Sequence, residues 1–209
     1  CVVISDINQE RLDQTTAAFE KKYGKDNVFG LQLDVTNSDS IASASQAIAL
    51  QFGGLDIVVN NAGISISKSF EDHNDQDWGK LNDLLVMGQF RISKLGVSLM
   101  KHQGLGGDIV NIVSKNALVA GPKNVAYGTA KAAQLHMSRL MAAELADEKI
   151  RVNVVNPDAV IENSNIWEGG WAENRAKLPQ DFIRRTLGKV FDSIYSTGER
   201  DRFRTRVER

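Results

Sequence analysis

This sequence predicts a doubly wound parallel α/β sheet, and two patterns carry that prediction. Short runs of apolar, mostly β-branched residues alternate along the chain with longer amphipathic stretches. The runs are apolar throughout rather than alternating with polar residues, as in parallel strands that are covered on both faces. Each amphipathic stretch is long enough for a crossover helix between two such strands. One α/β domain is therefore the simplest architecture for this chain of 209 residues.

The expected strands and helices follow one another in regular order. The strands fall at about 1–6, 27–34, 55–60, 108–113 and 150–156. The helices fall at about 8–23, 38–52, 76–103 and 125–147. This pattern weakens toward the end, where residues 182–209 carry seven arginines and one lysine against four acids. We expect an N-terminally truncated domain over 1–177 and a divergent or truncated tail over 178–209. Because acids interrupt the basic residues, a solvated, partly helical tail is expected rather than a nucleic-acid arm.

The net charge, the apolar runs and the cysteine and histidine content indicate which partners and which compartment to expect. The net charge of −1 favours neither a nucleic acid nor an anionic membrane as partner. No apolar run approaches the roughly 20 residues of a membrane span, and no secretory leader precedes the first apolar run. The single cysteine, Cys1, fits a reducing cytoplasm. Three scattered histidines give no metal-ligand spacing, so no metal site is expected.

Polar residues follow the ends of the first two predicted strands, where parallel sheets bind their ligands. Asp6 ends the first strand, and its carboxylate could accept hydrogen bonds from an adenosine ribose and repel a 2′-phosphate. That interpretation favours NAD over NADP, whereas an equally simple one makes Asp6 the N-cap of the next helix. Asp34 and Val35 follow the second strand and could bracket an adenine, or Asp34 could cap the helix near residue 38.

The third strand ends in Asn60-Asn61-Ala62-Gly63. The small residue Ala62 and the glycine Gly63 permit close approach of a ligand to the backbone. An ordinary turn would contain the same residues, but the position directly after an apolar strand favours a cofactor contact through Asn60, Ala62 and Gly63.

The most informative pair is Tyr127 and Lys131, four residues apart in a predicted helix and therefore on one face. An ammonium beside a phenol favours the phenolate, so we expect the tyrosine pKa to be lowered. Such a phenol can exchange a proton with an alcohol or carbonyl near neutral pH. Ser114, at the end of the fourth strand, can hydrogen-bond the same substrate oxygen. The spacing alone is common on solvated helices, and it gains meaning from the motifs at the strand ends.

Together these motifs resemble the short-chain dehydrogenase/reductase family, whose members have Rossmann-like sheets. The matching segments occur in the family's order and spacing over roughly 1–160: Asp6, Asp34-Val35, Asn60-Asn61-Ala62-Gly63, Ser114, Tyr127-Gly128-Thr129-Ala130-Lys131 and Arg151-Val152-Asn153. The resemblance implies hydride transfer between NAD(P) and a small alcohol or aldehyde. It implies Tyr127 as general acid/base, Lys131 as ligand of the nicotinamide ribose and Ser114 as holder of the substrate oxygen. Pro157 is implied as a further cofactor contact.

A narrower resemblance begins after the fifth strand, where Pro157-Asp158 stands in place of the family's usual Pro-Gly. The segment resembles the dehydrogenase half of bifunctional rhamnulose-1-phosphate aldolase/short-chain dehydrogenases. It consists of Asn156-Pro157-Asp158-Ala159-Val160, Ser164-Asn165-Ile166-Trp167-Glu168-Gly169-Gly170-Trp171 and Arg175-Ala176-Lys177. The implied substrate is lactaldehyde, oxidised to lactate in rhamnose or fucose catabolism. The tryptophans could shape a substrate lid or simply anchor the loop.

The sequence also departs from the family pattern. The family's first strand and glycine-rich turn, and its last strand, have no counterpart, so we expect a break in the middle of the sheet and poor folding alone. Leu85 occupies the position of an asparagine that holds a water in the family's proton relay, and Asn82 is too far around the helix to replace it. These departures leave open a catalytically weak or inactive relative that serves in oligomer assembly or nucleotide binding. The resemblance further implies a homodimer or homotetramer through helices 76–103 and 125–147, although their leucines Leu95, Leu99, Leu135 and Leu145 could equally pack inward.

Overall fold

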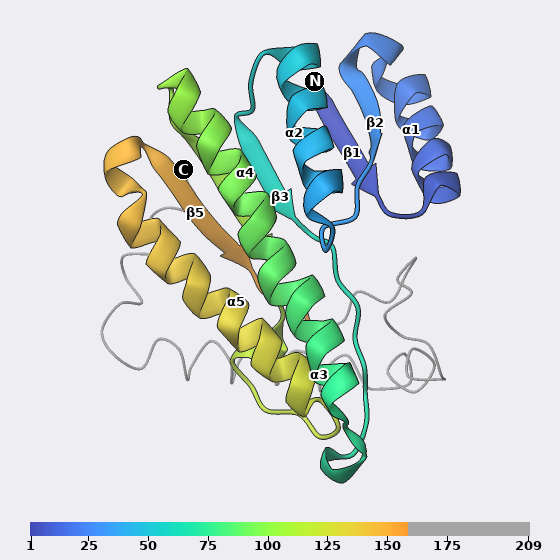
Figure 1. The fold of residues 1–209 in the computed structure, drawn as a ribbon, viewed down its shortest axis with the longest axis vertical. Coiled ribbons are helices and arrows are strands. Elements are labelled where there is room, and N and C mark those ends of the chain that lie inside the picture. Colours follow the sequence, from blue (N-terminus) through green and yellow to red (C-terminus); the bar gives the residue numbers. More distant parts are fainter. Residues whose placement is uncertain (159–209) are drawn as a thin grey trace, which may run out of the picture.

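The computed structural model describes residues 1–158 and shows an α/β fold with parallel strands (Figure 1). Its strands are β1 (Val2–Asp6), β2 (Val28–Gln32), β3 (Ile57–Asn60), β4 (Gly107–Ile112) and β5 (Ile150–Val155). Its α-helices are α1 (Gln9–Tyr23), α2 (Ser38–Phe52), α3 (Asp75–Leu81), α4 (Gly88–Gln103) and α5 (Val125–Glu144). The predicted order of elements is confirmed, with bounds that differ by only a few residues. The expected tail over 178–209 and the tryptophan-containing segment lie outside the described residues.

Within the described residues the strands form two separate parallel sheets. One sheet pairs β1 with β2, and the other has the order β3-β4-β5. The pairing is parallel throughout, with Val2 opposite Val28 and Val58 opposite Ile109. Because β1 and β3 belong to different sheets, the expected break in the middle of the sheet is confirmed.

Helices cover both faces of the β1–β2 sheet, as a doubly wound fold requires. Phe29 on β2 stacks edge-on against Phe52 of α2, with ring centroids 5.9 Å apart. A Cβ on the next residue, Gly30, would lie 2.6 Å from Thr16 of α1. Since successive residues of a strand point to opposite faces, α1 and α2 lie on opposite faces of this sheet. Figure 1 shows α2, α4 and α5 in front of the strands.

The β3-β4-β5 sheet is covered less evenly than the apolar strands predicted. Val58 is buried against α4, whereas its neighbours Ile57 and Val59 on the opposite face are 57% and 58% exposed. Val155 at the end of β5 is 47% exposed. The expectation of strands covered on both faces is therefore wrong for β3 within the described residues, because only the face toward α4 is closed.

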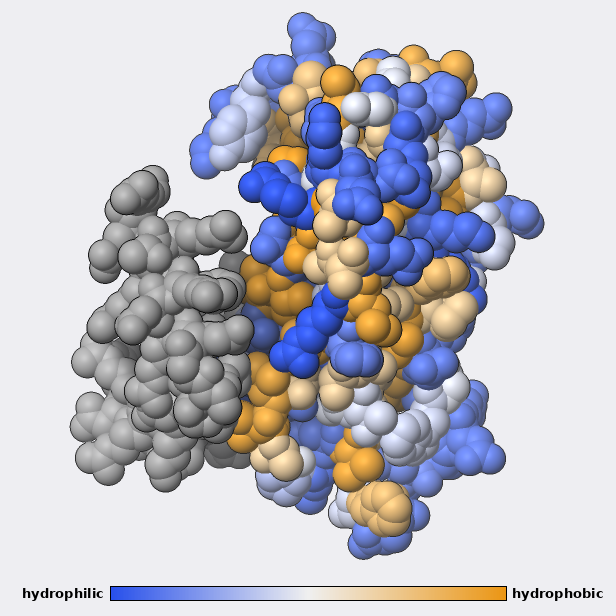
Figure 2. Space-filling model, turned by 90° about the vertical axis from the view of Figure 1, so that its left-hand side faces the viewer, coloured by the Kyte–Doolittle hydropathy of each residue, from blue (hydrophilic) through white to orange (hydrophobic). Residues whose placement is uncertain are grey.

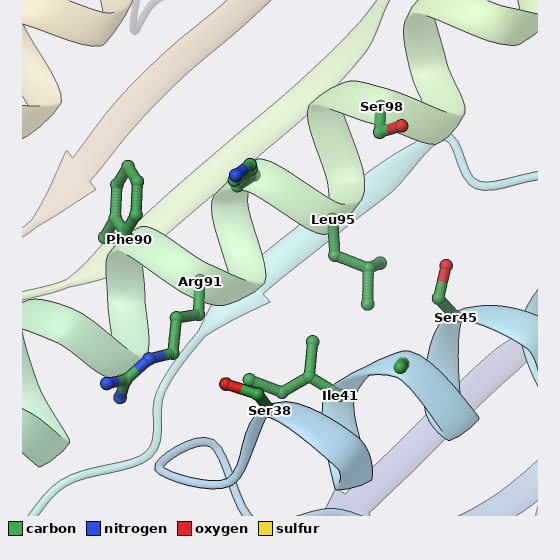
Figure 3. Close-up of a pocket in the computed structure, with 9 residues that line it drawn as sticks. Ser38, Ile41, Ser45, Phe90, Arg91, Leu95 and Ser98 are labelled. Atoms are coloured by element: carbon green, nitrogen blue, oxygen red, sulfur yellow. The ribbon is translucent and has the colours of Figure 1, made fainter.

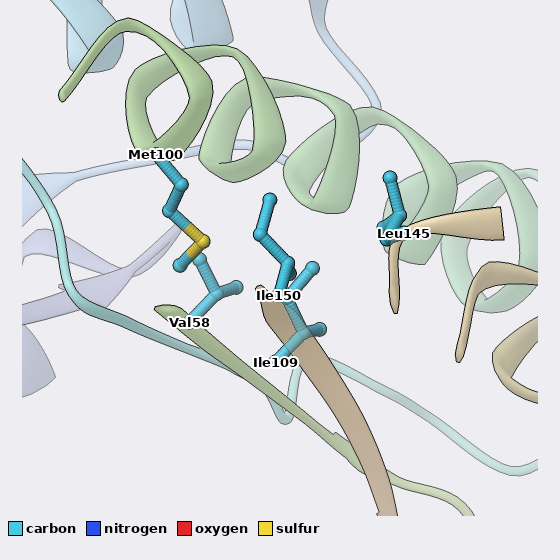
Figure 4. Close-up of a cluster of buried hydrophobic side chains, with 5 residues drawn as sticks. All are labelled: Val58, Met100, Ile109, Leu145 and Ile150. Carbon is cyan, nitrogen blue, oxygen red and sulfur yellow. The ribbon is translucent and has the colours of Figure 1, made fainter. Parts of the chain in front are cut away.

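The main hydrophobic cluster lies between this sheet and α4. Figure 4 shows its five buried members, which come from β3, α4, β4, the end of α5 and β5: Val58, Met100, Ile109, Leu145 and Ile150. A second cluster, of Leu81, Leu85, Ala126, Tyr127 and Ala130, joins the segment before α4 to the start of α5. This second cluster positions the helix that carries the candidate catalytic tyrosine.

The predicted continuous helix over 76–103 contains a π-helical turn at Asn82–Met87, between α3 and α4. Such turns insert one extra residue and occur often at functional sites. Here the turn brings Leu85 fully inside the second cluster. The helix was predicted, but the turn within it was not.

The surface mixes hydrophobic and hydrophilic residues. Figure 2, viewed from the side of α5 and β5, shows hydrophobic residues interrupted by hydrophilic ones. No helix among the described residues is long and apolar enough to cross a membrane.

Candidate active site

Tyr127 and Lys131 lie on one face of α5, as their spacing predicts, and both are nearly enclosed. Tyr127 is 7% exposed and Lys131 is 4% exposed. The α5 segment is held there by Ala126 and Ala130, which contact Leu81 and Leu85 in the second cluster. The pair therefore faces the protein interior near the carboxyl end of β4, rather than forming a solvated surface pair.

Lys131 has a defined partner on the strand. Its Nζ donates a hydrogen bond to the carbonyl oxygen of Ile112, the last residue of β4, over 3.0 Å. The same Nζ lies 5.7 Å from the centre of the Tyr127 ring. Burial lowers the pKa of Lys131 to about 8, because the interior disfavours the charged ammonium.

The predicted lowering of the Tyr127 pKa is wrong for this structure. Burial raises the pKa of Tyr127 above its ordinary value, and a hydrogen bond with the Ser114 side chain lowers it by less. The expectation considered the charge of Lys131 but not the loss of water around the phenol. Ser114, rather than Lys131, is the residue that favours the phenolate here.

Ser114 lies two residues after the end of β4 and is 7% exposed. Its backbone continues the extended strand, with φ −173° and ψ 156°. Its Oγ accepts a hydrogen bond from the Asn116 amide over 3.2 Å, which caps a short 3₁₀ turn, Lys115–Ala117. The end of β4 and the start of α5 thus bring Ser114, Tyr127 and Lys131 together, as predicted.

Leu85 occupies the expected relay position and is completely buried. A Cβ on Gly63 would lie 3.1 Å from Leu85 Cδ2 and 4.0 Å from Lys131 Nζ, so the leucine side chain lies beside the lysine. Asn82 is exposed and does not take its place. Gln134 on α5 holds the π-helical turn, because its Nε2 donates to the Leu85 carbonyl oxygen over 2.7 Å. The sequence did not reveal this role, because Gln134 lies in the middle of a predicted helix and its partner is 49 residues away along the chain.

The carboxylates predicted at the strand ends do not cap helices. Asp6 Oδ1 accepts from the Asn8 amide over 2.7 Å, and it is Asn8 that caps α1 by accepting from Arg11. Asp34 Oδ1 accepts from the amide and hydroxyl of Thr36 over 2.8 and 2.6 Å. The capping interpretations of both aspartates are therefore wrong, and both carboxylates shape the turns that follow their strands.

Val35 and Asn60 both contact α4. A Cβ on Gly88, the first residue of α4, would lie 2.9 Å from Val35 Cγ2. Asn60 Nδ2 donates to Ser93 Oγ over 2.9 Å and to Asn111 Oδ1 over 2.8 Å. The Asn60 amide thus links β3 to α4 and β4, directly before the loop that follows β3.

Residues 61–63 form an exposed loop after β3. Because Gly63 lacks a side chain, its backbone is open beside Lys131. An open backbone next to a buried ammonium fits the ribose and nicotinamide of a dinucleotide cofactor. Ala62, Gly63, Tyr127 and Lys131 are the candidates for holding that end of a cofactor. Asp6 at the end of β1, and Asp34 and Val35 shortly after β2, are the candidates for its adenosine end.

Pro157 lies beside the segment that follows β4. Its carbonyl oxygen accepts a hydrogen bond from the Lys115 amide over 3.0 Å. Asp158 forms an ion pair with the Lys115 ammonium, and the two side chains are only 7% and 16% exposed. Sequence reasoning noticed Asp158 in place of the usual glycine but missed its pairing with Lys115.

A cavity of about 340 Å³ lies elsewhere, between α2 and α4. Figure 3 shows Leu95 of α4 and Ile41 of α2 pointing toward one another in it. Its lining includes none of Ser114, Tyr127 and Lys131. Leu95 faces α2, and Leu135 and Leu145 are buried, so these three leucines pack inward.

The family model for short chain dehydrogenases matches residues 1–168, and the chain belongs to this family. It is 38% identical over 175 residues to an uncharacterized oxidoreductase, YuxG, of Bacillus subtilis, covering 84% of this chain and 25% of that protein. It is 31% identical over 191 residues to an NADP-dependent (R)-specific alcohol dehydrogenase of Lentilactobacillus kefiri, covering 88% of this chain and 75% of the relative.

Solved structures agree with this membership. A putative short-chain alcohol dehydrogenase of Sinorhizobium meliloti superposes with a TM-score of 0.73 at 30% identity, covering 83% of this chain and 69% of that one. The chain thus spans about a quarter of the YuxG relative and about three quarters of the Lentilactobacillus relative.

Proposed function

We propose that this protein is an oxidoreductase that moves a hydride between a nicotinamide cofactor and a small alcohol or aldehyde. The observation that carries the proposal is the convergence of Ser114, Tyr127 and Lys131 at the end of β4, in a chain of the short chain dehydrogenase family. A nicotinamide supplies the hydride acceptor or donor when it is bound. The protein supplies proton transfer and positioning.

Each of the three residues has a role that follows from its surroundings. The Tyr127 phenol gives a proton to, or takes one from, the substrate oxygen. Ser114 hydrogen-bonds that oxygen and, through its bond to Tyr127, favours the phenolate. Lys131, fixed by the Ile112 carbonyl, places an ammonium beside the open backbone of Gly63, where it can bind a ribose hydroxyl.

The test is reduction of NAD or NADP by the purified protein with a panel of small alcohols and aldehydes, lactaldehyde among them. Tyr127→Phe keeps the ring and removes the hydroxyl, so it should lower kcat at least 100-fold, since acid–base catalysis contributes about 10²–10⁴. Wild-type turnover no greater than that of Tyr127→Phe would contradict the proposal.

We further propose NAD as the preferred cofactor. Asp6 lies at the end of β1, where its carboxylate would bind ribose hydroxyls and repel a 2′-phosphate. The Lentilactobacillus relative is NADP-dependent, so family membership does not decide the preference. Asp6→Ala should raise KM for NAD and lower the preference for NAD over NADP, and an unchanged preference would contradict this role.

We propose lactaldehyde as the substrate. In this proposal the chain is the dehydrogenase part of a larger rhamnulose-1-phosphate aldolase/dehydrogenase. Support comes from the Pro157-Asp158 segment and from a relative, YuxG, of which this chain covers only a quarter. The decisive measurement is the production of lactate together with an equal molar amount of NADH.

We propose that the protein is cytoplasmic. Its lone cysteine, Cys1, is free and exposed, as in proteins of a reducing compartment.

A second candidate function is nucleotide binding or assembly with little turnover. The observation that favours it is Leu85, which fills the relay position with a side chain that neither donates nor accepts protons. If the missing relay limits turnover, Leu85→Asn should raise kcat per folded molecule, although burying an amide there should cost about 1–3 kcal/mol of stability. Strong wild-type turnover with no gain in Leu85→Asn would exclude this candidate.

We also propose a homodimer or homotetramer through α4 and α5. Each helix exposes a large apolar residue, with Phe90 on α4 at 44% and Leu140 on α5 at 57%. Light scattering should show a multiple of the 23.0 kDa chain, and Phe90→Asp with Leu140→Asp should reduce it to the monomer. A wild-type monomer at high concentration would contradict the proposal.

A further inference from the structure

The segment around Ser114 is tied to the end of β5 and the residues that follow it by three successive contacts. The Val113 amide donates to the Val155 carbonyl over 2.8 Å, and the Lys115 amide donates to the Pro157 carbonyl over 3.0 Å. The third contact is the ion pair between the side chains of Lys115 and Asp158. The parallel pairing of β4 with β5 is thereby extended beyond both strands, to the place where parallel sheets bind their ligands.

Ser114 lies at the centre of these contacts. Its backbone is extended, and Lys115, the next residue, begins the 3₁₀ turn Lys115–Ala117. The Ser114 side chain hydrogen-bonds Tyr127, and the Lys115–Asp158 ion pair holds the residue that directly follows the serine. Movement of Lys115 would therefore move the serine hydroxyl relative to the phenol.

The burial of the Lys115–Asp158 ion pair distinguishes it from the ion pair between β4 and β5. Arg151 and Asp108 join β5 to β4 at the opposite end of the strands, over 2.7 Å, but the arginine side chain is 76% exposed. The Lys115 and Asp158 side chains are only 16% and 7% exposed. Because a buried charge that loses its partner is costly, the buried pair resists separation far more than the exposed pair does.

We propose that Lys115 and Asp158 are positioning residues that fix the Ser114 hydroxyl against Tyr127. Neither side chain reacts; the pair acts through the backbone of the serine. The same contacts fix Pro157, so one buried pair holds both the serine and the predicted cofactor-binding proline. This proposal rests on the proposed dehydrogenase function for its kinetic test, but not for its spectroscopic one.

The kinetic test compares Lys115→Met and Asp158→Asn with Arg151→Met, which removes the exposed pair between the same strands. The first two variants should lower kcat about tenfold or more, because small misplacements of a catalytic group cost that much. Arg151→Met should stay within about twofold of wild type, since exposed pairs contribute little. Lys115→Arg keeps the charge and should recover most of the rate.

A double-substitution test identifies the route of the effect. If Lys115 acts through Ser114, Lys115→Met should cost little further rate in a Ser114→Ala background. An equal loss of kcat in both backgrounds would overturn the proposal, because the pair would then act independently of the serine.

The spectroscopic test needs no substrate. Ultraviolet absorbance follows ionisation of the Tyr127 phenol, with Tyr127→Phe subtracted to remove the other tyrosines. Lys115→Met should move this ionisation to higher pH, because the favourable Ser114 hydrogen bond is lost, and it should have no such effect in Ser114→Ala. An unchanged titration in folded Lys115→Met, confirmed by circular dichroism, would refute the proposal even if the protein catalyses no reaction. If the methionine variant does not fold, Asp158→Glu lengthens one arm of the pair and is judged by the same titration.

Discussion

At the scale of single residues, burial decides the electrostatics of the site. Tyr127 and Lys131 share one helix face as their spacing predicts, yet both are almost withdrawn from water. Burial disfavours the charged form of each group, so the pKa of the phenol is raised and that of the ammonium is lowered. The site therefore depends on polar contacts from Ser114 and the Ile112 carbonyl rather than on attraction between the two side chains.

The lowered pKa of Lys131 predicts a rise in stability above pH 8. Below about pH 8 the ammonium is charged in both the folded and the unfolded chain, so the folded protein carries the full cost of burying it. Between about 8 and the ordinary 10.5 the unfolded chain holds the proton more tightly, so the free energy of unfolding increases with pH. The slope is at most about 1.4 kcal/mol per pH unit. Urea unfolding at several pH values measures it.

Lys131→Met is the control for this titration, because it keeps an apolar chain of similar length and removes the charge. Its free energy of unfolding should lack the increase between pH 8 and pH 10. The range ends near pH 10 because the raised pKa of Tyr127 produces an opposing trend above its ordinary value of 10.0. The same slope in wild type and Lys131→Met would rule out Lys131 as its source.

Sequence spacing predicts which residues meet when they are close along the chain, and it predicts less about burial and distant partners. Four-residue spacing was enough to place Tyr127 with Lys131. The direction of the shift in the tyrosine pKa depends on burial, to which Leu81 and Leu85 contribute from a segment about 40 residues away in the sequence. Lys115 and Asp158 meet only because β4 and β5 are neighbours, and no local pattern reveals that contact.

At the scale of elements, regular hydrophobic periodicity identified every described strand and the long helices. The π-helical turn at Asn82–Met87 escaped prediction because its residues Leu84-Leu85-Val86-Met87 are apolar all round and fit a continuous buried helix. One inserted residue does not change composition, but it changes which side chain points inward. Leu85, which lies beside Lys131, belongs to this π-helical turn.

Packing of α4 on β3 depends on a glycine. A Cβ at Gly96 would lie 2.5 Å from Val58 Cγ2, too close for two carbon atoms. Gly96→Ala should therefore push the helix from the strand and lower the free energy of unfolding by about 1–3 kcal/mol. Chemical denaturation measures the loss.

Gly79 offers a matched control in the preceding helix, α3. A Cβ there meets nothing within 4 Å. Because alanine favours a helix over glycine, Gly79→Ala should raise stability by about 0.5–1 kcal/mol. Equal effects of the two substitutions would show that contact with Val58 does not determine the position of α4.

At the scale of the whole molecule, the break between β1 and β3 divides the described sheet into unequal parts. Both large hydrophobic clusters use residues from 58–150, whereas the β1–β2 sheet contributes to neither. On β1 and β2, Val28 is the one described strand residue that is buried. The sequence predicts the break itself, but the motifs do not reveal how the buried residues are divided between the two sheets.

This division predicts that the chain opens in stages. Without hydrogen bonds to β3, the β1–β2 sheet relies on α1, on α2 and on contacts such as Phe29 with Phe52. Its amide hydrogens should therefore exchange with solvent sooner than those of β4, which is paired on both edges by β3 and β5. Hydrogen exchange followed by mass spectrometry resolves these segments. Phe29→Ala should speed exchange in β1 and β2 and leave β4 unchanged, whereas equal acceleration in all strands would show that the two sheets unfold as one cooperative unit.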